Sequence, residues 1–281
     1  ISLPDSLAIN HLIPLLNGFI DEKGVVGIVV NTVKKAQKLA VECCDRYGDE
    51  NVVLLHSAFI ATERAKKGKE LLSYVGKDKD RPDHLIVIGT QVIEQSLDID
   101  FDVMISDLAP MDLLFQRMGR LHRHDIERPM KHQHPVFYVM GMSDDLDFDS
   151  GSVAVYGGYL LARTQAFLSE HLVIPDDISL MIQSVYGEDN TLFFQPETQK
   201  KYERMRQDYM KLLEHKKMRA KTYLLGKPVL NTKSGRSVSL VQWLESNFPN
   251  QSEESGYAQV RDSAETIEVI ALKKQESGYS L

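Results

Sequence analysis

Apolar runs alternate with helix-like stretches through the first half of the chain. The run from Val25 to Val30 is apolar throughout, as expected for a strand that is covered on both faces. Strands that alternate with helices form βαβ units, which build a mostly parallel sheet with right-handed crossovers. We therefore predict an α/β fold with strands at Val25–Val30, Val52–Leu55, Leu85–Ile88, Val103–Ser106 and Val136–Met140.

Helix signals fill the intervals between these runs. Thr32 is suited to cap the start of a helix and Gly48 to end it. A second helix is predicted to open at Thr62 and to close at Gly76. Apolar positions at helical spacing predict the buried faces, which are Ala36, Leu39, Ala40 and Cys43 on the first helix and Ala65, Leu72 and Val75 on the second.

The pattern changes after Met140, where four aspartates between positions 144 and 149 form an acidic stretch. This stretch lacks the glycine and glutamate of an EF-hand calcium loop, so we interpret it as a solvated linker. We divide the chain here into an α/β domain at 1–141 and a smaller, mainly helical accessory domain at 142–281. The elements predicted after the linker are helices at 155–171, 176–186, 196–221 and 240–246 and strands at 257–261 and 266–272.

Length and composition are those of an ordinary globular chain. With 281 residues, 43% of them hydrophobic, two domains can each bury a core. A net charge of −7 argues against a generally cationic surface for nucleic acid but allows a local basic one. No apolar run approaches a membrane span and the start does not resemble a signal peptide, so we expect a cytoplasmic protein.

The two cysteines and the first residue add two smaller expectations. Cys43 and Cys44 are adjacent, which is poor geometry for a structural disulfide and fits a reducing compartment. The chain opens with Ile1, followed by a short helical lead-in at 1–23 around Pro14. Because it does not start with Met, we expect a fragment of a longer protein.

The stretch from Gly89 to His124 carries the candidate chemistry. Gln116, Arg120 and Arg123 are spaced to share one face of a helix, opposite an apolar face of Leu114, Met118 and Leu121. Arginine is suited to bidentate capture of phosphate oxygens, so this helix is a candidate phosphate-sensing element. A solvated basic face on a core helix is the alternative.

Polar residues follow three of the predicted strands. They are Asn31 and Thr32, His56 and Ser57, and Gly89 and Thr90. Ligands bind outside the carboxyl ends of parallel strands, and these ends share one edge of the sheet, so we expect the three pairs to face the same edge. Each pair taken alone also fits ordinary turn and cap residues.

Two kinds of site are not supported. A phosphate-binding loop, Gly-x-x-x-x-Gly-Lys followed by Ser or Thr, is absent, so we expect this chain alone not to hydrolyse a nucleotide. Four histidines form two His-x-His pairs, but they follow a helix and flank a loop, so we predict no metal ligands at His122, His124, His132 and His134.

Four segments together resemble the ordered motifs of the second RecA-like domain of a superfamily 2 helicase. They are NTVKKAQKLA at 31–40, LLHSAF at 54–59, GTQVIEQSLDIDFD at 89–102 and LLFQRMGRLHRH at 113–124. The sequences of the last two segments are similar to those of the CRISPR-associated helicase-nuclease of type I systems. Segments similar to the C-terminal domain of that family are VYGGYLLARTQ at 155–165, IPDDISLMIQSVY at 174–186 and AQVRD at 258–262.

The resemblance implies roles for individual residues. Gln116, Arg120 and Arg123 would complete a nucleotide site across the cleft between two RecA-like domains, with the arginines stabilising charge on the γ-phosphate. Gln95 and Asp98 would lie on the ATP-facing side. The residues implied to lie at or near the DNA backbone are Thr90, Gln91, Asn31, Thr32, His56, Ser57 and Arg64.

The resemblance also implies an activity for the longer protein. It would be an ATP-dependent translocase or helicase on single-stranded DNA, recruited to a CRISPR surveillance complex. ATP and Mg would be held mainly by a first RecA-like domain, and the nuclease residues would belong to an HD domain further upstream. Closure and reopening of the two RecA-like domains would move the DNA in steps.

Two alternative functions stay open. Lys200 to Lys221 contains nine Lys or Arg against three acids, which would suit a non-enzymatic nucleic-acid or partner-docking module; a solvated helix face explains it as well. The second alternative is half of a superfamily 2 repair helicase.

Overall fold

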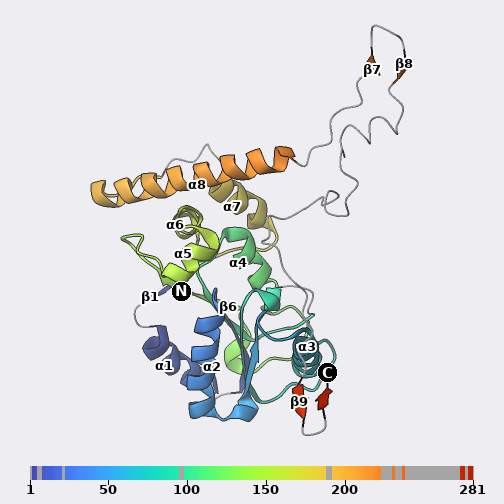
Figure 1. The fold of residues 1–281 in the computed structure, drawn as a ribbon. Coiled ribbons are helices and arrows are strands. Elements are labelled where there is room, and N and C mark those ends of the chain that lie inside the picture. Colours follow the sequence, from blue (N-terminus) through green and yellow to red (C-terminus); the bar gives the residue numbers. More distant parts are fainter. Residues whose placement is uncertain are drawn as a thin grey trace. The chain divides into compact units, whose positions relative to one another are not determined.

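The computed structural model describes residues 2–4, 8–20, 23–94, 98–187 and 192–222 and four short strands beyond them (Figure 1). The chain divides into two compact units, Ile1–Tyr209 and Met210–Leu281. The short strands form two antiparallel pairs, β7 (Leu230–Asn231) with β8 (Arg236–Ser237) and β9 (Lys273–Gln275) with β10 (Gly278–Ser280). The elements predicted at 240–246, 257–261 and 266–272 lie outside the described residues, and the boundary predicted after residue 141 stays a prediction.

A parallel sheet with the strand order β1-β6-β5-β2-β4-β3 forms the centre of the first unit. All five predicted strands are confirmed, with ends that shift by at most two residues. The additional strand β1 was missed because it is only three residues long and ends at a proline. The strands are β1 (Ser2–Pro4), β2 (Gly24–Val29), β3 (Val52–Leu55), β4 (His84–Gly89), β5 (Val103–Asp107) and β6 (Val136–Met142).

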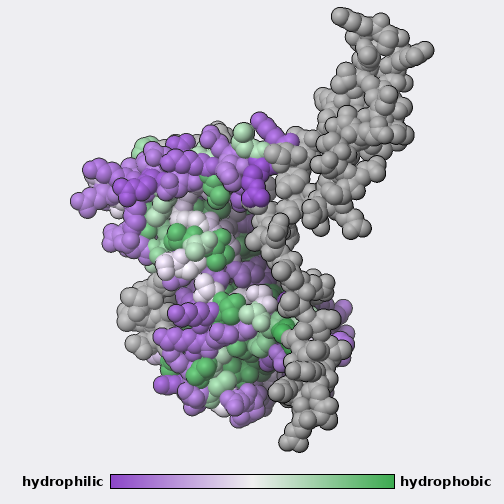
Figure 2. Space-filling view, viewed as in Figure 1, coloured by the Kyte–Doolittle hydropathy of each residue, from purple (hydrophilic) through white to green (hydrophobic). Residues whose placement is uncertain are grey.

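Helices follow the strands as the βαβ pattern predicts. None of the described helices is long and apolar enough to cross a membrane. The helices are α1 (Ala8–Ile20), α2 (Val33–Tyr47), α3 (Ala61–Val75), α4 (Met111–Met118), α5 (Ser150–Tyr156), α6 (Gly158–Phe167), α7 (Asp176–Tyr186) and α8 (Pro196–Thr222), with 3-10 turns at η2 (Asp49–Asn51), η3 (Gln91–Glu94) and η4 (Met130–His132). Figure 2 shows that α8 presents mainly hydrophilic residues on its visible face.

Both faces of the sheet are covered, which explains the continuous apolar strands. Val26 and Ile28 pack with the buried residues of α1 and α2, whereas Val25 and Val29 pack on the other face with those of α3. Figure 1 shows α1 and α2 together on one side of the sheet and α3 on the opposite side. Alternation along β2 therefore serves two hydrophobic layers.

The helix predictions hold best for α2. Thr32 caps it by accepting a hydrogen bond from the Lys35 backbone nitrogen, Gly48 ends it, and all four predicted apolar positions are buried. The predicted buried face of α3 is confirmed at Val75 and wrong at Ala65, which is exposed; Leu72 is only partly buried, and Gly68 and Leu71 are buried with Val75. Leu71 and Leu72 are adjacent, so the apolar pattern fits two rotations of the helix, and packing selects the one that buries Leu71.

The stretch predicted as one helix at 155–171 is two helices, α5 and α6. Gly157 separates them with φ 79°, a left-handed conformation that glycine adopts readily and that ends a helix. Two of the helices after residue 141, α6 and α7, pack on α4. Leu161 of α6 lies in a cluster with Leu114, and Met181 of α7 lies in one with Met111. This packing brings α4 into contact with both of these helices.

One glycine in β2 is required by a close approach. A Cβ atom built on Gly27 would lie 2.8 Å from the ring of Phe101, a side chain that is fully buried. Phe101 belongs to the segment that leads into β5 and packs across the middle of β2. The apolar run thus contains Gly27 because a ring occupies the space of its side chain.

We expect Gly27→Ala to lower the free energy of unfolding by about 1–3 kcal/mol, because the added methyl group displaces the Phe101 ring in a packed core. Urea denaturation measures the change. Gly18→Ala is the matched control, since Gly18 lies in α1 with nothing within 4 Å of the built Cβ, and alanine favours a helix there. A Gly27→Ala variant as stable as the control would contradict this account of the packing.

Candidate functional site

The polar residues that follow three strands lie at one edge of the sheet. In the parallel ladders, Gly89 at the end of β4 pairs with Val29 of β2 on one side and with Leu55 of β3 on the other. Asn31, His56 and Thr90 follow these three strand ends. The expected meeting of the strand ends at one edge is confirmed.

The side chains at this edge differ in how they are held. Thr90 is 1% exposed, and its hydroxyl has no hydrogen-bond partner within the described part of the chain. The His56 ring stacks on Phe59 with centroids 4.1 Å apart, and burial lowers the pKa of its imidazole. Ser57 and Arg64 are exposed. These two are the freely accessible members of the set implied to lie near DNA.

Arg117 occupies the centre of the site and is fully buried. Its Nε donates to Glu94 Oε1 at 2.7 Å, and its Nη1 donates to Ser106 Oγ at 2.8 Å and to the Asp107 carbonyl at 3.0 Å. Its Nη2 lies 3.3 Å from two further acceptors, Asn31 Oδ1 and the Tyr156 hydroxyl. We call Arg117, Glu94, Ser106, Asn31 and Tyr156 the Arg117 cluster.

Asn31 is fixed within this cluster from several sides. Its backbone nitrogen donates to Asp107 Oδ2 at 2.9 Å, and its Nδ2 donates to the Leu108 carbonyl and to Ser152 Oγ. Lys35 forms an ion pair with the same aspartate at 2.7 Å. Burial raises the pKa of Asp107, and the Lys35 ammonium opposes that rise. The Asn31 side chain is therefore part of an internal network that joins β2, β5 and α5.

Gln91 connects this network to the strand edge. Its Nε2 donates to the Asn31 carbonyl at 3.2 Å and to the Tyr156 hydroxyl at 2.9 Å. Thr32 is occupied in a different way, since it caps α2. Gln95 lies outside the described residues.

The prediction that Gln116, Arg120 and Arg123 share a helical face was wrong. The helix α4 ends at Met118, and only Gln116 lies on it, with an exposed side chain. After Gly119 the chain turns and pairs with the segment before β5, through hydrogen bonds from the Phe101 nitrogen to the Arg120 carbonyl and from the His122 nitrogen to the Phe101 carbonyl. Both arginines therefore lie beyond the helix end.

Arg120 is half-buried beside η3. Its Nη2 donates to the Glu94 carbonyl at 2.9 Å, whereas its buried Nε has no partner within the described ranges. Burial and the charge of the neighbouring Arg123 lower the pKa of its guanidinium, and Asp98 partly opposes this. No carboxylate within the described part of the chain forms an ion pair with it. The Arg120 charge is thus the least compensated of the site arginines.

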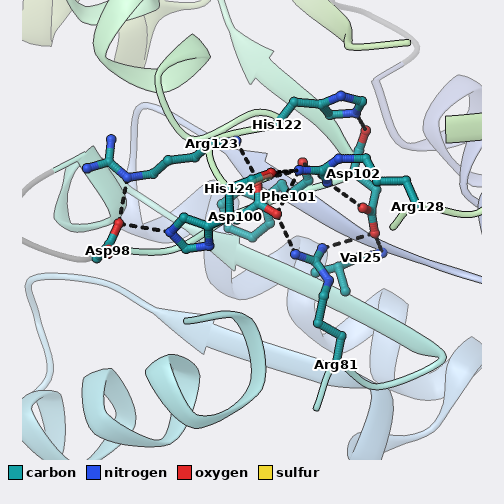
Figure 3. A network of polar contacts seen from close by, with 10 residues as sticks. All are labelled: Val25, Arg81, Asp98, Asp100, Phe101, Asp102, His122, Arg123, His124 and Arg128. Atoms are coloured by element: carbon teal, nitrogen blue, oxygen red, sulfur yellow. Dashed lines mark hydrogen bonds and ion pairs between the residues drawn. The ribbon is translucent and has the colours of Figure 1, made fainter. Parts of the chain in front are cut away.

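Arg123 and Asp98 lie at the surface and form a group with His124, whose side chain is only 9% exposed (Figure 3). Arg123 Nε donates to Asp98 Oδ1 at 2.6 Å, and His124 Nε2 lies 3.0 Å from the same oxygen. These two contacts lower the pKa of Asp98 to about 2. The two candidate residues Asp98 and Arg123, which the resemblance places on the nucleotide side, are direct partners here.

Next to this group, two buried aspartates lie between two arginines (Figure 3). Arg81 and Arg128 each contact both Asp100 and Asp102, at 2.5–3.0 Å. We call these four residues the aspartate clamp. Asp102 also accepts from the Val25 nitrogen at 2.8 Å, which fixes the start of β2. Sequence reasoning missed the clamp, although the alternation Asp98, Asp100, Asp102 already indicates one-sided carboxylates.

A metal site is not formed by the described residues, since they contain no group of three or more His, Cys, Asp or Glu placed to hold an ion. His132, one of the four histidines considered above, is 4% exposed and packs against Phe19, with the two ring centroids 5.6 Å apart. Both cysteines are free thiols, and burial raises the pKa of Cys43 to about 12. Arginine and amide donors therefore dominate the chemistry of the site.

The site can be compared with known proteins. A family model described as CRISPR-associated nuclease/helicase Cas3, C-terminal, matches residues 22–126. The CRISPR-associated nuclease/helicase Cas3 of Streptococcus thermophilus is 54% identical over 272 residues, which are 96% of this chain and 29% of that protein. The chain belongs to the Cas3 family.

Solved structures of the family agree with this assignment. T. fusca Cas3-AMPPNP matches with a TM-score of 0.62 and 30% identity, over 67% of this chain and 23% of that one. A chain of a CRISPR RNA-guided surveillance complex, pre-nicking, matches with a TM-score of 0.58 and 29% identity, over 73% of this chain and 25% of that one.

The Cas3 match fixes the fold and the place of the chain in the family. The parallel sheet is the expected RecA-like sheet, and the matched region is C-terminal. Half of a repair helicase is thereby set aside. The chain spans less than a third of the length of the curated relatives that it matches.

We expect Arg117→Met to lower the free energy of unfolding by about 3–5 kcal/mol, because it leaves the Glu94 carboxylate buried without its guanidinium. Arg117→Met combined with Glu94→Gln should recover part of this loss, since no buried charge then remains. Arg46→Met, at an exposed position near the end of α2, is the control and should stay within about 0.5 kcal/mol.

The deficit of Arg117→Met should depend on pH in a defined direction. Burial already raises the pKa of Glu94, and Arg117 opposes this rise, so the variant raises it further above the unfolded value of about 4.3. The folded state then binds the proton more tightly, and the deficit shrinks as the pH falls from neutral toward about 5. Urea denaturation at both pH values measures this, and an equal deficit at both would contradict the role of Glu94.

Proposed function

We propose that this chain is the part of an ATP-dependent, single-stranded DNA translocase or helicase in CRISPR interference that supplies arginines to the nucleotide site. By itself the chain would be inactive as an ATPase. The names of its relatives, which are nuclease/helicases, support the activity of the longer protein. The sequence has no phosphate-binding loop, which supports the inactivity of the isolated chain.

The state of Arg120 carries this proposal. A half-buried guanidinium attracts an anion when no carboxylate neutralises it, because burial weakens screening by water. Arg120 meets this condition and is held from one side by the Glu94 carbonyl. Its fork of N–H donors matches phosphate oxygens. The γ-phosphate of a nucleotide bound by a neighbouring domain is the anion we propose.

Arg123 would act beside it by exchanging partners. Its ion pair with Asp98 is open to water, with side chains that are 40% and 54% exposed. Exposed pairs of this kind contribute about 0–1 kcal/mol. A phosphate could therefore replace Asp98 at the guanidinium at little cost to the fold, and Asp98 would hold Arg123 ready in the absence of nucleotide.

The nucleotide and the metal ion differ in how well the described residues suit them. Guanidinium and amide N–H groups of Arg120, Arg123 and Gln116 suit phosphate oxygens, and ATP would supply the phosphate bond that is hydrolysed. Magnesium prefers oxygen ligands, and these three side chains offer only one, the amide oxygen of Gln116. We propose that Mg and most of the nucleotide are held by a first RecA-like domain of the native chain. The match to the T. fusca Cas3-AMPPNP structure supports binding of a nucleotide in the family.

The proposed partners follow from the same family. Single-stranded DNA would run along the strand edge, where the amide of Gln91 lies beside the Thr90 hydroxyl, which has no hydrogen-bond partner among the described residues. The match to a chain of a CRISPR RNA-guided surveillance complex supports recruitment to such a complex. The names of the relatives support a nuclease domain in the same native chain, and the motif resemblance is the basis for proposing that it is an HD domain.

In the intact native protein, we expect Arg120→Ala to keep nucleotide binding and to lose DNA-stimulated ATP hydrolysis by about 10³-fold or more, because a transition-state arginine is removed. Nucleotide binding is measured by fluorescence titration and turnover by phosphate release. Arg46→Ala removes the same side chain from an exposed site and should leave both unchanged. Undiminished turnover in Arg120→Ala would exclude the proposed role.

A second candidate function rests on α8. Most of its side chains from Arg206 to Lys221 are exposed, so its cationic excess is accessible to a phosphate backbone. A helix of this kind could give the chain a DNA-docking role that needs no nucleotide.

If α8 docks DNA, the isolated chain should bind a single-stranded oligonucleotide at low salt. The triple variant Lys216→Gln, Lys217→Gln and Arg219→Gln should weaken that binding and flatten its salt dependence. Fluorescence anisotropy over a salt series measures both. Absence of binding by the unaltered chain at low salt would exclude this role.

A further inference from the structure

Tyr156 lies between the proposed DNA contact and the proposed nucleotide contact. We infer that it is a positioning residue which links Gln91 to Arg120, so that DNA binding changes how Arg120 is held. The inference rests on the proposed function of those two residues. Tyr156 comes from α5, a helix after the predicted domain boundary, and its role would tie that segment to the motor.

The Tyr156 hydroxyl serves two donors at once. It accepts from Gln91 Nε2 at 2.9 Å and from Arg117 Nη2 at 3.3 Å. The ring is half-buried, and burial raises the pKa of the phenol, against the opposing charge of Arg117. The hydroxyl is therefore neutral at physiological pH, and it joins the amide to the guanidinium without adding a charge.

Gln91 cannot contact DNA through its amide nitrogen without giving up one of its partners. An amide nitrogen carries two hydrogens, and both are used here, one by the Asn31 carbonyl at 3.2 Å and one by Tyr156. The Asn31 carbonyl belongs to backbone fixed at the end of β2, whereas the Tyr156 hydroxyl is the tip of a side chain. Tyr156 is thus the partner that a DNA phosphate would displace.

The path from Tyr156 to Arg120 runs through one buried ion pair. Arg117, which shares the Tyr156 hydroxyl, donates to Glu94 Oε1 at 2.7 Å. The backbone carbonyl of the same Glu94 accepts from Arg120 Nη2 at 2.9 Å. When Gln91 leaves, the Tyr156 hydroxyl accepts a hydrogen bond from Arg117 alone. The Arg117 guanidinium and the Glu94 side chain that it holds then shift. Because the Glu94 carbonyl holds Arg120, the position of Arg120 shifts as well.

A double-mutant cycle in the intact native protein tests this link. Tyr156→Phe keeps the ring and removes only the hydroxyl. We expect the ratio of DNA-stimulated to DNA-free ATP hydrolysis to fall about 5-fold or more, with the KM for ATP unchanged. In a Gln91→Ala background, which already lacks the donor, Tyr156→Phe should lower the ratio no further.

Tyr159→Phe is the matched control. Tyr159 lies three positions away in α6, where its ring contacts Tyr202 and Tyr209, outside the Arg117 cluster. Its ratio should equal that of the unaltered protein, and thermal unfolding of both Phe variants checks that the fold is intact. A purely structural role of Tyr156 would lower both rates equally and leave their ratio unchanged.

Two outcomes would overturn the link. One is an unchanged ratio of DNA-stimulated to DNA-free hydrolysis in Tyr156→Phe. The other is a double variant whose ratio falls by the product of the two single-variant reductions. Full DNA stimulation in Gln91→Ala would overturn it as well, because Gln91 is the proposed DNA end. These results are distinct from failure of the proposed function, which appears as retained turnover in Arg120→Ala. An inactive Arg120→Ala with an unchanged Tyr156→Phe ratio would reject only this inference.

Discussion

The buried guanidinium of Arg117 constrains the geometry of the whole site. Transfer of a charge out of water costs several kcal/mol unless partners satisfy it. The Arg117 cluster supplies these partners from the ends of β2 and β5, from η3 and from α5. Since each acceptor must lie within hydrogen-bond reach of one rigid fork, the four segments are fixed relative to one another. The strand ends, the turn with Gln91 and α5 therefore form one polar unit.

The sequence pattern predicted correctly those strands and helices whose apolar residues pack into the two hydrophobic layers, one on each face of the sheet. Strands covered on both faces are continuously apolar, and α2 has a single unambiguous face, so both were located correctly. The α3 face was ambiguous because Leu71 and Leu72 are neighbours. The end of α4 was missed for another reason. Pairing of Leu121 with Phe101 draws the chain out of the helix, and spacing along the sequence contains no information on that partner.

The candidate site shows the same division. Strand order and motif resemblance located the edge residues, because both depend on local sequence. Arg117 was passed over, since an arginine on a helix normally faces water. Its burial depends on Glu94 and Tyr156, which are 23 and 39 residues away. Only the folded chain brings these groups together, so the interior of the site could not be derived from spacing alone.

Burial also separates ion pairs that hold the fold from those that can exchange. The aspartate clamp is buried, and each of its arginines contacts both carboxylates. Loss of one partner there would leave a buried charge without compensation, so these four ion pairs are not expected to exchange partners. Asp98 lies two residues before the clamp, and its side chain is 54% exposed and that of its partner Arg123 40%. Water or an incoming anion can therefore compete with Asp98 for the Arg123 guanidinium. A single alternating run of aspartates thus fixes the chain just before β5 at one end and leaves an arginine exchangeable at the other, which is the combination that the proposed site, completed by a neighbouring domain, would require.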